Sequence, residues 1–497
     1  MTITDRAGSV RTDARWSLLL VLSLAGLLAL RLVALKLSAT DLFFDEAQYW
    51  SWAQTPDFGY YSKPPLIAWL IYGSTQVCGD GEFCVRVTSP IVHTLTSLVV
   101  FLTGRQLYDA RTGALAGLAF ATLPGVSVSA GIISTDVPLL FFWSLALYAF
   151  VLLNATRSWW PALLLGVALG LGLNAKYAIA WFVLSALVYI AATRSARHLL
   201  TDARAYVALV IAAALIAPNI AWNLEHKFAT FSHTADNAKW HGSMLNPVNA
   251  LEFVAAQFGV FGPILFAGLI LITWRAWREG LPEADRLLLA FALPVVLVIT
   301  VQAFLSRAPA NWAAVSYVAA TLLVIATMVR DLDWAWLTRS FVLHILLAVA
   351  LAAATVFAGR FALPSGVDPY ARTLGWRALA EATRAEIAKS ASAGTPYAAV
   401  VADERSVTAE LLYYMRESAT PVLAWRSGST PQDHFELTRP FTPAVAGPVL
   451  LVSLAANPSH ITGRFAAARQ IGVSQLPAGA GKPRRVTFFA LEGYNGK

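Results

Sequence analysis

Long apolar runs separated by short loops recur along most of the chain, and they constrain its fold more than any other feature of the sequence. A helix needs roughly 20 apolar residues to cross a bilayer, and on that criterion we count about eleven candidate spans. These runs cover residues 16–36, 85–103, 113–131, 137–154, 160–174, 176–192, 205–222, 256–274, 287–305, 312–329 and 340–360. Only 13% of the 497 residues are charged, whereas a soluble domain is about one quarter charged. The sequence therefore predicts a polytopic α-helical membrane protein.

Arginine residues recur in every second loop, starting from the N-terminus. These loops carry Arg105 and Arg111; Arg157; Arg194, Arg197 and Arg204; Arg275, Arg278 and Arg286; Arg330 and Arg339. Loops rich in Lys and Arg stay on the cytoplasmic side of a membrane. The net charge of +8 therefore indicates topology rather than nucleic-acid binding, and an odd number of spans puts the C-terminus outside.

The two ends of the chain differ from its apolar middle. The first run follows Arg11 and Arg15 without a small-residue cleavage site, so we expect a retained helix rather than a signal peptide. We expect residues 1–15 to form a cytoplasmic N-terminus and 16–361 a transmembrane domain.

Residues 362–497 regain ordinary levels of charge, Pro, Gly and Ser. Residues 397–403 and 447–454 look like short buried strands, and 376–390 have the three-to-four spacing of an amphipathic helix. We therefore predict a small C-terminal α/β domain on the periplasmic side.

The stretch FFDEAQYW places Asp45 and Glu46 just beyond the first predicted span. Asp45 is a plausible N-cap of a short interfacial helix, and the aromatic residues suit the headgroup level of a membrane. One interpretation is an ordinary helix cap in an aromatic belt. The other is a carboxylate held where a membrane-bound substrate presents its reacting atom, ready for general-base chemistry.

The stretch YYSKPPL follows, with Lys63 directly before two prolines. Pro64 favours an extended backbone at Lys63, and a proline often begins a helix, here a second interfacial one. A lysine fixed in this way suits a phosphate, although a snorkelling lysine is the simpler alternative. We count Lys63, Tyr60 and Tyr61 among the substrate-binding candidates.

Three further polar residues belong to the predicted outer face. Asp136 opens the fourth span in STDVPLL; it caps that helix, or Ser134 or Thr135 does so and leaves Asp136 facing a cavity. His241 lies in a long loop that either lines a polar site or is simply solvated. Arg307, in SRAPANW, breaks the charge rule, which a bidentate contact to phosphate or carboxylate would explain.

Cys78 and Cys84 lie close together outside the apolar runs. They either form a small disulfide in an oxidising compartment or remain free thiols. Their spacing and the lack of neighbouring Cys/His pairs suggest no zinc site.

DEAQYW, YYSKPPL, STDVPLLFFW and SRAPANW, taken together in this order, resemble the GT-C membrane glycosyltransferases. The chain is most similar to the bacterial branch related to protein O-mannosyltransferases and to the aminoarabinose transferase of lipid A. The resemblance covers roughly residues 10–330 and implies a GT-C fold with interfacial helices in the first outer loop. It implies transfer of a sugar from a polyprenyl phosphate, without a nucleotide cofactor, in the bacterial inner membrane.

The resemblance also implies roles for individual residues. Asp45 corresponds to the essential carboxylate, with Glu46 beside it; it would deprotonate an acceptor hydroxyl or position an anionic phosphate. Lys63 corresponds to the lysine that contacts the donor phosphate, and Asp136 to the acidic residue that opens the fourth helix. The aminoarabinose transferases carry an acidic residue associated with a metal directly before this lysine. Ser62 stands there in this chain, so we expect no metal.

Several functional alternatives remain open. The acceptor is lipid A or lipopolysaccharide, another envelope glycan or lipid, or, as in protein O-mannosyltransferases, a secreted protein. The sugar is a uronic acid, an aminopentose or a hexose; basic residues such as Lys63, Lys176 and Arg307 tolerate an acidic one. A transporter of a lipid-linked or anionic substrate, or an envelope scaffold, would also place many helices in a membrane. The transporter would not readily explain interfacial helices and an outer soluble domain, and mutation of Asp45 would leave a scaffold unaffected.

Overall fold

The computed structural model describes residues 3–238, 245–363 and 368–496, and the chain divides into two compact units. The first unit comprises Met1–Lys36, Lys63–Ile67 and Arg86–Ala353; the second comprises Leu37–Ser62, Ala68–Val85 and Ala354–Lys497. Most of the segment between the first span and residue 85 therefore groups with the C-terminal residues. The domain boundaries at 15 and 361 stay predictions.

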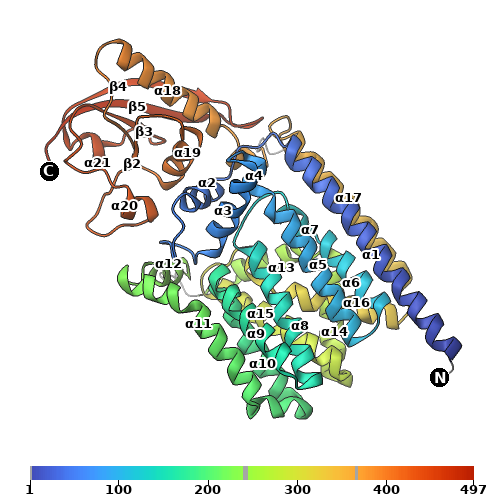
Figure 1. Ribbon diagram of the computed structural model, residues 1–497. Helices are drawn as coiled ribbons and strands as arrows, with labels where there is room; N and C mark the ends of the chain where they lie inside the picture. Colours follow the sequence, from blue (N-terminus) through green and yellow to red (C-terminus); the bar gives the residue numbers. More distant parts are fainter. Residues whose placement is uncertain (1–2, 239–244, 364–367, 497) are drawn as a thin grey trace. The chain divides into compact units, whose positions relative to one another are not determined.

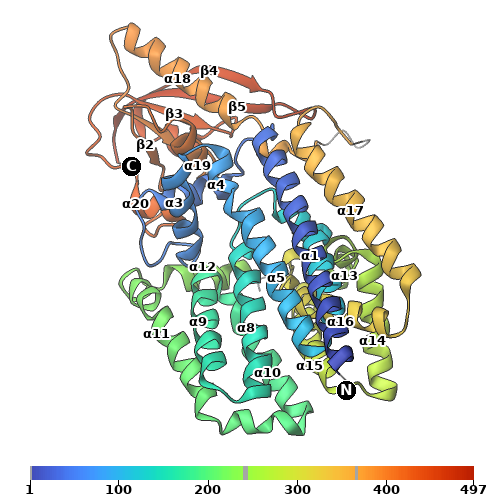
Figure 2. The ribbon, with the colours of Figure 1, turned by 45° about the vertical axis from the view of Figure 1, so that its right-hand side comes forward.

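The regular secondary structure of the first unit, within the described residues, is helical (Figure 1). Their bounds are α1 (Ile3–Leu37), α5 (Thr88–Leu107), α6 (Ala110–Thr122), α7 (Pro124–Ser129), α8 (Asp136–Thr156), α9 (Trp159–Ala175), η1 (Tyr177–Ala180), α10 (Trp181–Ala192), η2 (Arg194–Leu200), α11 (Ala203–Glu225), α12 (Ala229–Ala238), α13 (Pro247–Val260), α14 (Pro263–Glu279), α15 (Glu283–Leu305), η3 (Ala310–Ala313), α16 (Ser316–Arg330) and α17 (Trp334–Val356). Helix α9 packs between α8 and α11 (Figure 2). Buried aromatic rings of Trp143, Phe182 and Phe291 pack edge to face where α8, α10 and α15 meet.

Six helices within the described residues are long and apolar enough to cross a membrane, or seven if α13 and α14 form one broken span. The shorter apolar helices α9, α10 and α16 occupy three more of the predicted runs. The helical membrane class is therefore confirmed. The count of about eleven spans stays a prediction.

Two of the predicted runs are not continuous helices, and the expectation of one helix in each was wrong. In run 113–131, α6 ends at Thr122 and α7 begins at Pro124, because the residue before a proline is pushed out of the helical region. In run 256–274, α13 and α14 meet at an angle of 118°. Gly262 has a φ of 93° there and is followed by Pro263, so the helix cannot continue.

Helices α5 and α6 approach each other through glycine. A Cβ atom on Gly113 would lie 2.6 Å from the carbonyl oxygen of Phe101, and one on Gly104 would lie 2.7 Å from the Cα atom of Gly113. Small residues let helix backbones come this close in membranes, where packing drives association.

Substitution Gly113→Ala should lower the thermal unfolding midpoint, because the added methyl group meets backbone atoms that cannot yield cheaply. We expect a loss of about 1–3 kcal/mol from overpacking. Gly26→Ala in α1 is the matched control, since a Cβ atom there meets nothing within 4 Å. Equal midpoints for the two variants in detergent would contradict the close contact.

The second unit combines short helices with one mixed sheet. Its elements are α2 (Phe44–Ala53), α3 (Leu66–Cys78), α4 (Glu82–Arg86), η4 (Ala371–Thr373), α18 (Trp376–Ser392), β1 (Ala399–Ala402), α19 (Arg405–Tyr414), β2 (Val422–Ala424), α20 (His434–Thr438), β3 (Val449–Ser453), α21 (Ser459–Thr462), β4 (Phe465–Leu476) and β5 (Arg484–Tyr494). The strand order is β2-β1-β3-β5-β4, with β1 parallel to β2 and β3, and β5 antiparallel to β3 and β4. The predicted strands in 397–403 and 447–454 and the helix in 376–390 are confirmed.

Alternate side chains of the central strands form an apolar core. Val401 of β1 and Leu451 of β3 pack there with Trp425 and Phe465. Helices α18 and α19 contact each other and the sheet (Figure 1). Two residues separate the end of β1 from Arg405, which begins α19.

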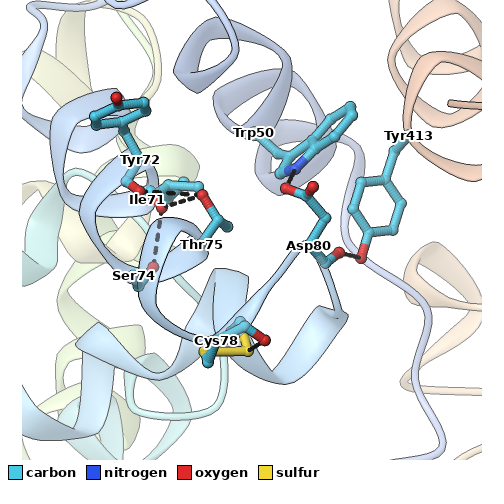
Figure 3. The surroundings of a disulfide bond; sticks show 9 residues. Trp50, Ile71, Tyr72, Ser74, Thr75, Cys78, Asp80 and Tyr413 are labelled. Atoms are coloured by element: carbon cyan, nitrogen blue, oxygen red, sulfur yellow. Dashed lines mark hydrogen bonds between the residues drawn. A yellow bond between two sulfur atoms is a disulfide. The ribbon is translucent and has the colours of Figure 1, made fainter.

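A disulfide between Cys78 and Cys84 closes a short loop in the second unit (Figure 3). Asp80 lies in this loop. Its Oδ1 atom accepts a hydrogen bond of 2.7 Å from Nε1 of Trp50 in α2, and its carbonyl oxygen accepts one of 2.7 Å from the hydroxyl of Tyr413 in α19. The loop therefore ties α2 to α19, and of the two alternatives for the cysteines the structure has the disulfide.

Replacing both cysteines by serine should destabilise the second unit by about 2 kcal/mol, the chain-entropy value for so short a loop. The measurement is the thermal unfolding midpoint of wild type and double variant, each with and without reductant. Reductant should lower the wild-type midpoint to that of the variant and leave the variant unchanged. A wild-type midpoint that ignores the reductant would contradict the expectation.

Candidate active site

Helix α2 carries the Asp-Glu pair, but the two carboxylates have different tasks. The N-cap is Phe43, not Asp45 as the sequence suggested. Glu46 is buried, and its Oε2 accepts a hydrogen bond of 2.8 Å from the backbone N–H of Phe43. A carboxylate at this third helical position satisfies an open N–H group at the start of the helix. The geometry therefore gives Glu46 a structural role and leaves Asp45 available for another.

Asp45 forms an ion pair with an arginine from the C-terminal part of the chain. Nη1 of Arg405 lies 2.8 Å from Oδ1 of Asp45 and 2.7 Å from Oε1 of Gln48, one turn further along α2. The side chains of Arg405 and Asp45 are 35% and 36% exposed, whereas Gln48 is buried. Both partners belong to the second unit, and the pair holds the Asp45 carboxylate in one orientation while leaving it accessible.

Tyr60 and Tyr61 were both predicted to bind substrate, and both hydroxyls form hydrogen bonds to backbone groups of the second unit. The hydroxyl of Tyr60 donates to the carbonyl of Trp52 at 3.1 Å and accepts from the N–H of Asp57 at 3.0 Å. Burial raises the pKa of the Tyr60 phenol, so the hydroxyl stays a donor. The hydroxyl of Tyr61 donates to the carbonyl of Pro431 at 2.8 Å. These contacts shape the segment after α2; substrate binding by either tyrosine stays a prediction.

Lys63 and Asp136 belong to the first unit. Lys63 is half-buried directly before Pro64 and Pro65, and α3 begins at Leu66, close to the predicted start. The lysine of one sequence motif and the aspartate of another therefore belong to the same compact unit.

Asp136 is the first residue of α8 and does not cap it with its side chain. Its Oδ1 accepts a hydrogen bond of 2.6 Å from Nζ of Lys176, and its Oδ2 accepts one of 2.6 Å from Nδ2 of Asn311. The side chains of Lys176 and Asp136 are only 20% and 14% exposed. The ammonium group of Lys176 is thus held in place by the carboxylate of Asp136, and a fixed cation of this kind suits a phosphate.

Arg307 and His241 are the two remaining predicted residues. Arg307 is exposed, and its carbonyl oxygen accepts a hydrogen bond from the side chain of Gln302. From the same SRAPANW motif it is Asn311 that reaches Asp136. His241 lies outside the described residues. Phosphate or substrate binding by these two residues stays a prediction.

Sequence reasoning missed Arg405 and Asn311 and gave Lys176 no partner. Asn311 lies in the SRAPANW motif, four residues after Arg307. Arg405 follows Asp403 and Glu404 directly after a buried strand. Charged residues at the C-terminal ends of parallel strands are frequent in functional sites, and this signal was available.

The residues around Lys63 do not fit a metal site. Ser62 stands at the position before the lysine, and its Oγ atom accepts a hydrogen bond of 3.5 Å from Nε2 of Gln48. Among the residues that the structure describes, no group of three or more His, Cys, Asp or Glu is placed to hold a metal ion. We derive no metal-dependent step.

A double-mutant cycle on Asp136→Ala and Lys176→Met should give a coupling free energy of about 1–3 kcal/mol, because this pair is largely shielded from water. The same cycle on Asp331→Ala and Arg275→Met is the internal control. That pair is 39% and 54% exposed, and exposed pairs contribute less than about 1 kcal/mol. Unfolding of each set of variants in detergent gives both values. Similar coupling for the two pairs would argue against a shielded ion pair at the start of α8.

Comparison with known proteins gives matches of three kinds. A family model described as dolichyl-phosphate-mannose-protein mannosyltransferase matches residues 62–222. The lipid A galacturonosyltransferase RgtD of Rhizobium johnstonii is 36% identical over 441 residues, which cover 88% of this chain and 91% of that protein. The undecaprenyl phosphate-alpha-4-amino-4-deoxy-L-arabinose arabinosyl transferase of Pseudomonas aeruginosa is 33% identical over 164 residues, 32% of this chain and 29% of that protein.

The crystal structure of ArnT from Cupriavidus metallidurans in the apo state matches with a TM-score of 0.67. The match covers 96% of this chain and 98% of that one at 17% identity, so it shows the fold alone. The sequence resemblance drawn from the four motifs is confirmed, as is the GT-C fold. Because the galacturonosyltransferase match extends over nearly the whole of both proteins, this chain belongs to the GT-C membrane glycosyltransferases and is an enzyme of that family.

Proposed function

We propose that this protein transfers a galacturonosyl residue from a polyprenyl phosphate to lipid A on the periplasmic face of the inner membrane. One observation carries the proposal: the 36% identity to a lipid A galacturonosyltransferase, over 88% of this chain. The arabinosyl transferase relative, whose name specifies an undecaprenyl phosphate donor, supports the choice of the lipid carrier.

In this proposal the first unit holds the donor phosphate. Lys63 and Lys176 supply positive charge, and Asp136 with Asn311 keeps Lys176 in place. As the sugar leaves its carrier, negative charge develops on the phosphate oxygen. Fixed cations aimed at such developing charge lower the barrier without having to reorganise during the reaction.

Asp45 acts on the acceptor in this proposal. The acceptor oxygen forms a bond to the anomeric carbon, the bond between that carbon and the phosphate oxygen breaks, and polyprenyl phosphate leaves. Asp45 takes the proton of the acceptor hydroxyl as this bond forms. Its ion pair with Arg405 fixes the carboxylate while about a third of the Asp45 side chain stays exposed.

Two features support the proposed orientation, with the N-terminus in the cytoplasm and the second unit in the periplasm. Arginine residues recur in the loops assigned to the cytoplasm. The disulfide between Cys78 and Cys84 belongs to the second unit, and disulfides persist in the periplasm but rarely in the cytosol.

A protein acceptor is the second candidate, because the family model that matches residues 62–222 is described by protein mannosyltransferases. The same assay separates the two candidates. The purified enzyme receives one polyprenyl-phosphate sugar, and lipid A and an unfolded secreted protein compete as acceptors.

The decisive assay follows release of free polyprenyl phosphate, and the mass of lipid A, by mass spectrometry. With polyprenyl-phosphate galacturonic acid as donor, lipid A should gain one hexuronic acid residue. Asp45→Asn should lower kcat by at least about 100-fold, the usual contribution of a general base. Asp57→Asn is the matched control, because it makes the same change a few residues away and keeps the acceptor for the N–H of Phe58.

The possible outcomes separate the hypotheses. Sugar on the protein and none on lipid A would move the assignment to the protein acceptor. Full activity of Asp45→Asn would remove Asp45 from the chemistry. Donor uptake into vesicles without any cleavage of the sugar–phosphate bond would favour the transporter.

A further inference from the structure

Arg405 has an arrangement that its pairing with Asp45 does not fully explain. Both hydrogen bonds to α2, to Asp45 and to Gln48, come from the same nitrogen, Nη1. Nε and Nη2 lie on the other edge of the planar guanidinium group. Within the described residues these two nitrogens donate to no protein acceptor, and the side chain is 35% exposed. One edge of Arg405 is therefore used by the protein, and the other is open.

The open edge is held in a fixed orientation. The guanidinium carbon of Arg405 lies 4.9 Å from the ring centroid of Phe44, which limits rotation of the group. Gln48, which accepts the second hydrogen bond, is 1% exposed and cannot move freely. An arginine edge with two parallel N–H groups matches a carboxylate in both spacing and planarity.

An acidic sugar creates an electrostatic problem that Arg405 can solve. If the donor carries galacturonic acid, its carboxylate enters a region that already contains the carboxylate of Asp45, and like charges repel. A cation between the two carboxylates removes this repulsion. A neutral or basic sugar would not need such a cation.

The acidic neighbours of Arg405 do not cancel this effect. Burial raises the pKa of the Asp403 carboxyl, whose Oδ2 accepts a hydrogen bond of 2.5 Å from Ser453. Burial and the nearby Asp403 also raise the pKa of Glu404. Arg405 donates to neither of these acids, because its hydrogen bonds in the described residues go to Asp45 and Gln48.

We propose that Arg405 is the specificity residue for the sugar: its Nε and Nη2 bind the carboxylate of the uronic acid while Nη1 holds Asp45. This inference rests on the proposed function, because it requires an acidic donor sugar. It assigns selection of the sugar to the C-terminal part of the chain, which the resemblance to the family left without any function.

The test compares two donors that differ only in this carboxylate: polyprenyl-phosphate galacturonic acid and polyprenyl-phosphate galactose. Wild type should prefer the acidic donor. Arg405→Gln should lower kcat/KM for the acidic donor by about 100-fold, the usual effect of removing one partner of a charged contact. The same variant should lower kcat/KM for the neutral donor far less, so that the preference narrows.

Arg416→Gln is the matched control. Arg416 lies two residues after the end of α19, and its guanidinium carbon also lies 4.9 Å from an aromatic ring, that of Tyr413. It pairs with no carboxylate in the described part of the chain and donates to the carbonyl of Tyr413. This variant should keep the wild-type preference. Arg405→Lys keeps the positive charge but loses the pair of parallel N–H groups. Its preference for the acidic donor should therefore lie between those of wild type and Arg405→Gln. If Arg405→Gln does not fold, Arg405→Lys is used for the test instead. If turnover of the neutral donor is too slow to measure, the shift of the thermal unfolding midpoint on adding each donor compares the binding of the two donors instead.

The outcomes distinguish this inference from the proposed function. If wild type transfers galacturonic acid and Arg405→Gln loses activity with both donors equally, Arg405 only positions Asp45 and the inference is wrong. An unchanged preference in Arg405→Gln also overturns it. If wild type transfers galactose but not galacturonic acid, or transfers neither sugar, the proposed function fails and this inference fails with it.

Discussion

Hydrocarbon offers no hydrogen-bond partner to a peptide group, and this constraint governs the first unit. Backbone groups at membrane depth must bond within their own helix, so the apolar runs become helices, and the breaks occur where proline or glycine permits them. Ionised side chains cost less at the ends of such helices than at membrane depth. Asp136 lies at such an end: at the start of α8 it accepts hydrogen bonds from the ammonium group of Lys176 and from the side-chain amide of Asn311.

The second unit is organised by contacts between its N-terminal and C-terminal parts. The disulfide loop binds Trp50 of α2 and Tyr413 of α19 through one residue, Asp80. Arg405 connects the same two helices from the other end of α19. The helix that carries the candidate base is therefore held in place by contacts with the C-terminal part of the chain.

Local patterns predicted much of the fold. The apolar runs, the strands within 397–403 and 447–454 and the helix within 376–390 follow from periodicity alone, which depends on neighbours a few residues apart. The errors also have local causes. Pro124 and Gly262 interrupt runs that are uniformly apolar, and the hydropathy of a run does not predict where its helix breaks. The side chain that accepts a hydrogen bond at the start of α2 belongs to Glu46 and not to Asp45, because a carboxylate inside the first turn can reach back to the N–H of the N-cap residue.

The sequence by itself determined the membrane class and the family, and it predicted three candidate site residues, Asp45, Lys63 and Asp136, because each lies in a short motif with unusual chemistry. Tertiary structure alone decided the partners of these residues. Arg405 is 360 residues from Asp45, and Asn311 is 175 residues from Asp136. No periodicity or propensity extends over such separations; these contacts exist only because packing of distant helices and strands brings the side chains within hydrogen-bonding distance.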